Sequence, residues 1–321
     1  MSANAQKRSA PPVRDALNGL YFFTRFAYSF SALGYRQRRL CWSDIGNAFE
    51  GQRWLVTGAS GGIGKAVTQG AVDGGADVLA VARSAEKLAR LAGSAEGVET
   101  QVCDLSLMED IRRMVDALVE EDVGPIDVLV NNVGVLLNAW QVTEEGHETS
   151  FATNLLGHYV LTEAMLERGL LSDDAVIINM TSGGMYNVPL SVEHLDITDP
   201  ASHDGVLAYA YQKRAQVELN RWWREQHADG NRQFFVMHPG WADTEGVKTS
   251  LPAFRKLFAS VLRDAEAGAD TALWLAATQP VQRQGDAVWF DRKARAAHVS
   301  RATRRTTDDA AGLVAFLRDS L

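Results

Sequence analysis

Residues 57–64 of the chain read TGASGGIG, between an apolar run at 54–56 and a helical pattern. In a turn that leads from a strand into a helix, Gly58 permits the tight bend, Gly62 lets the backbone approach a pyrophosphate, and Gly64 allows the helix to pack closely on the strand. The pyrophosphate would then lie at the positive end of the helix. A glycine cluster in this context therefore predicts a nucleotide-binding turn.

Strand-like runs and helical patterns alternate along the rest of the chain. Strands are predicted at 54–56, 78–82, 100–103, 128–130, 176–179, 234–237 and 288–290, and helical patterns lie around 111–119, 159–168, 211–226 and 265–278. Strands separated by helices build a parallel sheet that is covered on both faces. We therefore expect one α/β domain over residues 51–321, a doubly wound parallel sheet of the Rossmann type, preceded by an N-terminal helical extension over residues 1–50.

The composition is that of an ordinary globular protein, with 46 % hydrophobic and 22 % charged residues among 321. It excludes a disordered, collagen-like or disulfide-scaffold protein. The formal net charge of −8 argues against nucleic acid as a partner, because phosphate binding needs a basic face. Cys41 and Cys103 have no disulfide or metal-ligand spacing, which fits a reducing compartment. The histidines are scattered, so we expect no metal site.

The first 41 residues are basic and aromatic. They contain seven Lys or Arg against one acid, a net charge of +6. Phe23, Phe26 and Phe30 are spaced for one face of a helix. One interpretation is a basic amphipathic helix within residues 13–40 that lies on an anionic membrane surface. The other is a helix whose aromatic face packs on the rest of the protein. No run is long enough to cross a bilayer, because Arg25 interrupts the best candidate.

The end of the second predicted strand, 78–82, indicates which nucleotide binds. A site that selects NAD places an acid there for the ribose 2′-hydroxyl. This strand is followed by Arg83 and Ser84, so no acid is available. Arg83 offers a bidentate contact to a 2′-phosphate, which favours NADP(H) over NAD(H). The alternative interpretation is that Arg83 is an ordinary solvated arginine.

Three side chains have the chemistry of a carbonyl site. Tyr209 and Lys213 are four positions apart, so they share one face of a helix. Because a phenol with an ordinary pKa of about 10 is a poor base at neutral pH, we expect the neighbouring ammonium to lower the pKa of Tyr209. Ser182 follows the strand predicted at 176–179, where its hydroxyl is placed to hold a carbonyl oxygen.

Together, these features resemble the short-chain dehydrogenase/reductase superfamily, over residues 52–290. The glycine turn matches that family's TGxxxGxG pattern. The resemblance implies a Rossmann fold and an enzyme of EC 1.1.1 type, which transfers a hydride between a nicotinamide cofactor and an alcohol/carbonyl pair. It also implies a catalytic tetrad, formed here by Asn154, Ser182, Tyr209 and Lys213.

The resemblance further implies which residues contact the cofactor. Asp104 would hold the adenine amino group, the segment NNVG at 131–134 would follow the fourth strand, and the loop at 239–244 would orient the nicotinamide. The complete set comprises Gly58, Ser60, Gly61, Gly62, Ile63, Gly64, Arg83, Asp104, Leu105, Asn131, Asn132, Val133, Gly134, Tyr209, Lys213, Pro239, Gly240, Trp241 and Thr244. Four later segments, at 209–214, 237–244, 268–271 and 291–293, resemble one narrower branch of the family.

The chain departs from the family in the spacing of its serine and tyrosine. Ser182 lies 27 positions before Tyr209, a longer interval than the family usually shows. The segment 183–208 therefore carries extra residues, and comparable insertions in retinol- and steroid-handling relatives imply an apolar substrate. Thr181 is the rival hydroxyl, but strand alternation and the family pattern both favour Ser182.

We therefore predict an NADP(H)-dependent oxidoreductase that interconverts an alcohol and a carbonyl of an apolar small molecule, with Tyr209 as general acid/base. The alternative from another class is a non-catalytic NADP(H)-binding sensor or scaffold protein. A third is an epimerase or dehydratase of the family's long branch, which the glycine spacing disfavours. We expect a cytoplasmic location, with peripheral membrane contact only through residues 13–40. Since relatives form dimers or tetramers, we also expect a homo-oligomer.

Overall fold

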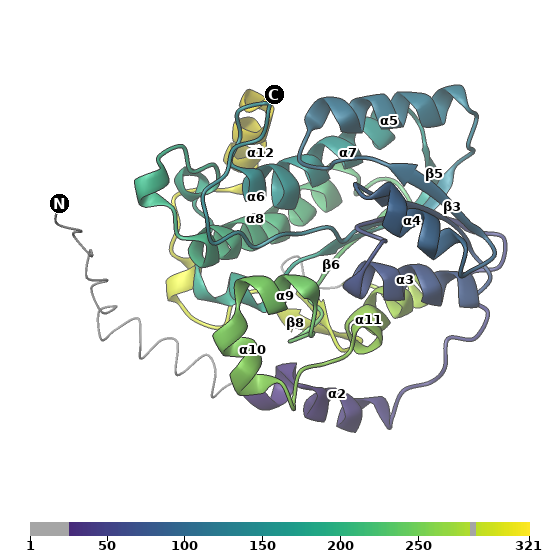
Figure 1. Ribbon diagram of the computed structural model, residues 1–321, viewed down its shortest axis with the longest axis horizontal. Helices are drawn as coiled ribbons and strands as arrows, with labels where there is room; N and C mark the ends of the chain where they lie inside the picture. Colours follow the sequence, from purple (N-terminus) through teal and green to yellow (C-terminus); the bar gives the residue numbers. More distant parts are fainter. Residues whose placement is uncertain (1–25, 283–286) are drawn as a thin grey trace.

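A computed structural model describes residues 26–282 and 287–321. An eight-stranded sheet forms its centre, in the order β3-β2-β1-β4-β5-β6-β7-β8 (Figure 1). The strands are β1 (Arg53–Thr57), β2 (Asp77–Ala82), β3 (Val98–Val102), β4 (Ile126–Asn131), β5 (Leu171–Met180), β6 (Gln233–Met237), β7 (Ala287–Phe290) and β8 (Lys293–Ala296). Neighbouring strands are parallel except for the antiparallel hairpin of β7 and β8. The expected doubly wound Rossmann sheet is confirmed.

The central strands bury side chains on both faces of the sheet. In β1, Leu55 belongs to one apolar core, whereas Trp54 and Val56 belong to the other. In β5, Ile177 and Ile178 are divided between the two cores in the same way. Strands buried on both faces read as continuous apolar runs, which is why these strands are visible in the sequence.

Helices cover each face of the sheet (Figure 1). The core that contains Trp54 is closed by α3 (Gly62–Asp73), α4 (Ala85–Ala92) and α11 (Ala265–Thr278). The core that contains Leu55 is closed by α5 (Met108–Glu120), α7 (Gly157–Glu167), α8 (Gly205–Gln226) and α12 (Ala310–Asp319). Among the described residues, no helix is both long and apolar enough to span a membrane.

The strand order reverses direction at β1, which has β2 on one side and β4 on the other. In open α/β sheets, ligands bind beyond the carboxyl ends of the strands at this switch point. The segments that follow β4 and β6 leave the sheet at these carboxyl ends. They contain the short helices α6 (Thr149–Phe151), α9 (Glu245–Ser250) and α10 (Pro252–Phe258). The fold thus predicts the ligand site at the ends of β1, β4, β5 and β6.

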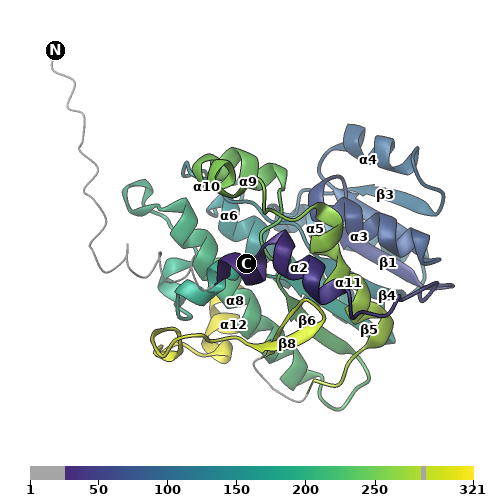
Figure 2. The ribbon, with the colours of Figure 1, turned by 90° about the horizontal axis from the view of Figure 1, so that it is seen from below.

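The N-terminal extension packs on the rest of the protein. Helical backbone runs over residues 26–30, and α2 (Ala32–Arg39) follows; it lies at the lower edge of Figure 1 and crosses in front of the sheet in Figure 2. The Phe30 side chain is buried, and its ring stacks on that of Phe26. For Phe26 and Phe30, the interpretation in which the aromatic face packs on the rest of the protein is therefore the one that applies. Phe23 and the rest of residues 13–25 lie outside the described residues.

Candidate active site

The glycine-rich turn connects β1 to α3. Gly58 has a φ of 67°, in the left-handed region that favours glycine. A Cβ atom on Gly64 would collide with the Gly58 carbonyl oxygen, so the close packing expected of Gly64 is present. Gly61 is exposed, has open space around its Cα, and begins α3 without a side-chain cap. The N–H groups of the first turn of α3 are thus available to an anion.

Thr57 fastens this turn to the loop that follows β4. Its hydroxyl donates to the Val130 carbonyl oxygen and accepts hydrogen bonds from the backbone N–H groups of Asn132 and Val133, at 2.9 and 3.1 Å. Asn132 Nδ2 returns a bond of 2.8 Å to the Thr57 carbonyl oxygen. These hydrogen bonds therefore hold the carboxyl ends of β1 and β4 in a fixed position relative to each other.

Asn131 has a different place from the one expected. It is fully buried at the end of β4, and its Nδ2 donates to Thr162 Oγ1 and Asn179 Oδ1 at 2.9 and 3.0 Å. Asn179 continues the chain of amides to Asn220 on α8. With no exposed surface, Asn131 holds the end of β4 from within the core, and its contact with a cofactor stays a prediction. Ile63 is nearly buried and packs in the core against Gly268.

Ser182, Tyr209 and Lys213 come together between β5 and α8. The Ser182 hydroxyl lies within hydrogen-bonding reach of the Tyr209 phenol, and Lys213 Nζ lies 5.6 Å from the centre of the Tyr209 ring. Lys213 is buried, and its ammonium donates to the Met180 carbonyl oxygen at 2.9 Å. The rival Thr181 is buried as well, and its hydroxyl donates to the Lys213 carbonyl oxygen at 2.6 Å. Of the two hydroxyls, only that of Ser182 meets the phenol.

Asn154 approaches the same place from the other side. It lies in a single π-helical turn, Ala152–Leu156, between α6 and α7, and such turns are frequent at functional sites. Its Oδ1 accepts from the Val135 N–H at 2.7 Å, and its Nδ2 donates to Gln212 Oε1 at 2.8 Å. A Cβ atom on Gly134 would lie 3.3 Å from both Asn154 Oδ1 and Lys213 Nζ, so these two side chains flank one exposed glycine.

Burial controls the protonation of Tyr209 and Lys213. It lowers the pKa of Lys213 from 10.5 to about 7, because the charged ammonium has left water. Burial also raises the pKa of Tyr209, and the nearby Ser182 hydroxyl opposes that change only in part. The expectation that Lys213 lowers the pKa of Tyr209 is therefore wrong for the protein alone. Desolvation outweighs the effect of the Ser182 hydroxyl, and it favours the protonated phenol.

The loop after β6 closes the site at its open edge. Gly240 has a φ of 76°, and Thr244 begins α9 with its hydroxyl bonded to the Val247 N–H. A Cβ atom on Gly62 would lie 3.6 Å from Thr244 Cγ2, so Thr244 faces the glycine turn. At the other end of α9, Asn138 Nδ2 donates to the Ser250 carbonyl oxygen at 2.9 Å. The α9 segment thus bridges the glycine turn and the loop after β4.

The remaining predicted contacts lie after β2 and β3, at the same edge of the sheet. Arg83 is exposed directly after β2 and forms no ion pair with the described residues. Asp104 is half-buried after β3, where its Oδ1 accepts from the Ser106 N–H and hydroxyl at 2.9 and 2.7 Å. Leu105 is buried beneath it. Asp104 is thus held in one orientation by Ser106.

The insertion between Ser182 and Tyr209 belongs to the core more than to the site. Met185, Leu190 and Leu195 are buried in the apolar cores. Arg214 is also buried, and its guanidinium donates to the carbonyl oxygens of Met185, Val188 and Ala297. The apolar content of the insertion is therefore explained by packing, and on its own it is no evidence of an apolar substrate.

Two residues at the site, Gln212 and Arg263, were not predicted from the sequence. Gln212 lies between Tyr209 and Lys213, and its side chain reaches Asn154, Glu148 and Ser150. Its place inside the YxxxK pattern was the available signal. Arg263 contacts Pro239 and Gly240 from a distant part of the chain, and no local pattern marks it. Among the described residues, no three His, Cys, Asp or Glu side chains gather as metal ligands.

The geometry above is that of an oxidoreductase with a Rossmann fold. The family model described as short chain dehydrogenase matches residues 52–192. The chain is 36 % identical, over 78 % of its length and 79 % of the relative's, to dehydrogenase/reductase SDR family member 12 of Bos taurus. It therefore belongs to the short-chain dehydrogenase/reductase family.

More distant relatives agree with this assignment. Retinol dehydrogenase 12 of Homo sapiens is 28 % identical over 71 % of this chain and 74 % of its own. Among solved structures, the NADP complex of Pseudomonas aeruginosa RhlG is 25 % identical, with a TM-score of 0.61 over 77 % of this chain and 96 % of that one.

Proposed function

We propose that the protein is an NADP(H)-dependent oxidoreductase that interconverts an alcohol and a carbonyl of an apolar small molecule, a reaction of EC 1.1.1 type. One observation carries the proposal. The Tyr209 phenol lies within hydrogen-bonding reach of the Ser182 hydroxyl, with Lys213 beside its ring, at the sheet edge that also carries the glycine turn. A phenol and a hydroxyl held together are two donors for one substrate oxygen.

The residues present fit a dinucleotide. The uncapped N-terminus of α3, the open space at Gly61 and the exposed guanidinium of Arg83 would hold its phosphates. Asp104 would hold its adenine, and Lys213 and Thr244 would hold its nicotinamide half. The bound nicotinamide would supply or accept the hydride. NADP in the RhlG complex supports the choice of dinucleotide, as does Arg83.

The chain's own groups would manage the substrate oxygen and its proton. In reduction, Ser182 and Tyr209 donate hydrogen bonds to the carbonyl oxygen, and Tyr209 gives up its proton as negative charge develops there. The raised pKa of Tyr209 keeps the phenol protonated before the reaction, as this role requires. The protonated ammonium of Lys213, whose pKa is about 7, would then stabilise the negative charge of the phenolate. Asn154 holds the loop in which Gly134 lies.

Aromatic side chains beside the site support an apolar substrate. Trp241, Phe254 and Phe258 are half-buried and in mutual contact, with ring centres 4.9–5.2 Å apart. They extend from the loop after β6 onto α10, where Leu257 is 75 % exposed. Retinol, in the name of one relative, is an alcohol of this class.

The proposal is tested with a panel of apolar aldehydes and ketones and with NADPH, using Tyr209→Phe and Tyr211→Phe as a matched pair. Tyr211 is half-buried on the same helix and stacks on His194. We expect Tyr209→Phe to reduce kcat at least 1,000-fold with little change in NADPH affinity, and Tyr211→Phe to change kcat less than 3-fold. Tight NADPH binding without turnover by the parent protein would support the sensor instead.

We also propose a cytoplasmic homo-oligomer in which residues 1–50 form an extension and residues 51–321 the catalytic domain. Light scattering gives the oligomeric state directly. Sedimentation with anionic vesicles tests the membrane contact proposed for residues 13–40, and protein that stays in the supernatant would refute that contact.

A further inference from the structure

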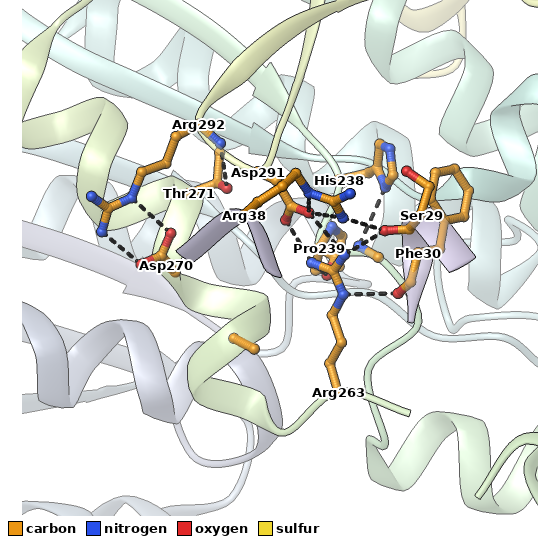
Figure 3. A network of polar contacts seen from close by, with 12 residues as sticks. Ser29, Phe30, Arg38, His238, Pro239, Arg263, Asp270, Thr271, Asp291 and Arg292 are labelled. Atoms are coloured by element: carbon orange, nitrogen blue, oxygen red, sulfur yellow. Dashed lines mark hydrogen bonds and ion pairs between the residues drawn. The ribbon is translucent and has the colours of Figure 1, made fainter. Parts of the chain in front are cut away.

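Arg263 is 1 % exposed, yet all five of its N–H donors have acceptors. Nη1 and Nη2 form a bidentate ion pair with Asp291, at 2.6 and 3.0 Å. The remaining donors reach three backbone carbonyl oxygens, those of Phe30 at 2.8 Å, Ser29 at 2.9 Å and Pro239 at 3.3 Å (Figure 3). One guanidinium therefore joins the N-terminal extension, the loop after β6 and the turn after β7.

Asp291 is held by a second arginine. Arg38 of α2 donates from Nε to Asp291 Oδ2 at 2.7 Å, and its other end reaches the Ser29 carbonyl oxygen. Asp291 and Arg292 form the turn between β7 and β8 with φ values of 49° and 56°. Non-glycine residues adopt this conformation at a cost, so their ion pairs help to hold the turn. Arg292 pairs separately with Asp270, away from the loop after β6.

The contacts of Arg263 end on residues that face the proposed site. The Trp241 backbone N–H donates to the Phe30 carbonyl oxygen at 3.0 Å, and the Trp241 carbonyl oxygen accepts from the Arg263 backbone N–H at 2.8 Å. A Cβ atom on Gly240 would lie 2.6 Å from the guanidinium. On the other side, a Cβ atom on Gly183, the residue after Ser182, would lie 2.8 Å from the Phe30 ring. Phe30 thus separates the loop after β6 from the serine.

We propose that Arg263 is a positioning residue, and that the N-terminal extension is part of the active site through it. By binding residues 29–30 and 239–241 together, Arg263 fixes the loop that presents Thr244 to the glycine turn. The extension supplies the carbonyl oxygens of Ser29 and Phe30, which accept from Arg263, and the Phe30 ring, which packs against Trp241 of this loop. The inference rests on the proposed function only where it concerns the cofactor. We call the contacts by which Arg263 holds residues 29–30, 239–244 and 291 together the clamp, and these contacts do not depend on the proposed function.

The first test compares Arg263→Lys with Arg292→Lys by hydrogen exchange and by NADPH binding. A lysine keeps the charge but cannot span the five acceptors. Arg292→Lys removes a bidentate pair of the same kind, 11–14 % exposed, beside the same turn. We expect Arg263→Lys to speed exchange at residues 239–244 at least 10-fold, with β4 and β5 unchanged, and to weaken NADPH binding at least 10-fold. We expect Arg292→Lys to change neither more than 2-fold.

A second pair keeps the test decisive if Arg263→Lys does not fold. Gly240→Ala pushes a methyl group against the guanidinium, whereas Gly146→Ala carries the same backbone strain, at a φ of 94°, with nothing within 4 Å. Faster exchange at residues 239–244 in Gly240→Ala alone would support the clamp. Unchanged exchange there in both Arg263→Lys and Gly240→Ala, or equal effects in the controls, would overturn it. If the parent binds no nucleotide, the proposed function fails, while the exchange measurement still decides the clamp.

Discussion

Asn154 Nδ2 donates a hydrogen bond to Gln212 Oε1 across 2.8 Å, and both side chains are fully buried. Gln216, one turn further along α8, donates to the Asn154 carbonyl oxygen at 2.7 Å. The helix that carries Tyr209 and Lys213 therefore also fixes the π-helical turn that carries Asn154. α8 therefore fixes the position of Asn154 relative to Tyr209 and Lys213.

Gln212 should consequently affect turnover although it is not placed to touch the substrate. Gln212→Met removes the partner of Asn154 and leaves a buried donor unsatisfied, which costs about 1–3 kcal/mol of unfolding free energy. We expect kcat to fall about 10-fold, with NADPH affinity within 2-fold of the parent. Steady-state kinetics and denaturant unfolding measure the two effects. Gln69→Met on the surface of α3 is the control, and an unchanged kcat in Gln212→Met would contradict the positioning role.

Lys213 should make stability depend on pH. Because its pKa is about 7 in the folded protein and 10.5 in the unfolded chain, the unfolded state binds more protons between these values. The unfolding free energy therefore rises with pH across this window, by about 2 kcal/mol from pH 7 to pH 9. Lys213→Met should lack this rise. Urea unfolding at several pH values tests it, and parallel pH profiles of parent and variant would refute the buried ammonium.

Arg83 should set the preference between the two dinucleotides. An exposed guanidinium after β2 gains a charge-assisted contact only from a 2′-phosphate. We expect Arg83→Ala to weaken NADPH binding about 10- to 100-fold and to leave NADH binding unchanged. Arg90→Ala, which removes an exposed arginine of α4 paired with Glu86, should affect neither. Fluorescence titration with both nucleotides measures this, and equal losses for NADPH and NADH would remove Arg83 from the phosphate site.

Much of the fold and of the candidate site follows from local patterns. The β1–α3 turn and the central strands are visible because glycine spacing and continuous apolar runs are direct consequences of backbone approach and of burial on both faces. The short strand β8 was not predicted, since its sequence, KARA, alternates charged with small residues at the sheet edge.

The unpredicted features are those that depend on burial between distant segments. A sequence shows Arg263 as one more arginine, because its five acceptors come from residues 29, 30, 239 and 291. The insertion after Ser182 was interpreted through its apolar residues, but they fill the core. The direction of the Tyr209 pKa shift was wrong for the same reason, since desolvation is a property of the assembled site.

Alanine substitutions at two glycines of the turn at 57–64 should distinguish an effect on helix packing from an effect on ligand binding. In Gly64→Ala the new methyl group meets the Gly58 carbonyl oxygen and Asn132 Nδ2, so the strand and helix must move apart. We expect a loss of about 2 kcal/mol or more of unfolding free energy, together with the loss of nucleotide binding.

In Gly61→Ala the methyl group enters open space from an extended backbone with a φ of −170°, so the unfolding free energy should change by less than about 0.5 kcal/mol. NADPH binding should nevertheless weaken about 10-fold, because the methyl group occupies the approach to the first turn of α3. Thermal unfolding and nucleotide titration of both variants provide the comparison. Unimpaired NADPH binding by Gly61→Ala would mean that the phosphates lie elsewhere than at the N-terminus of α3.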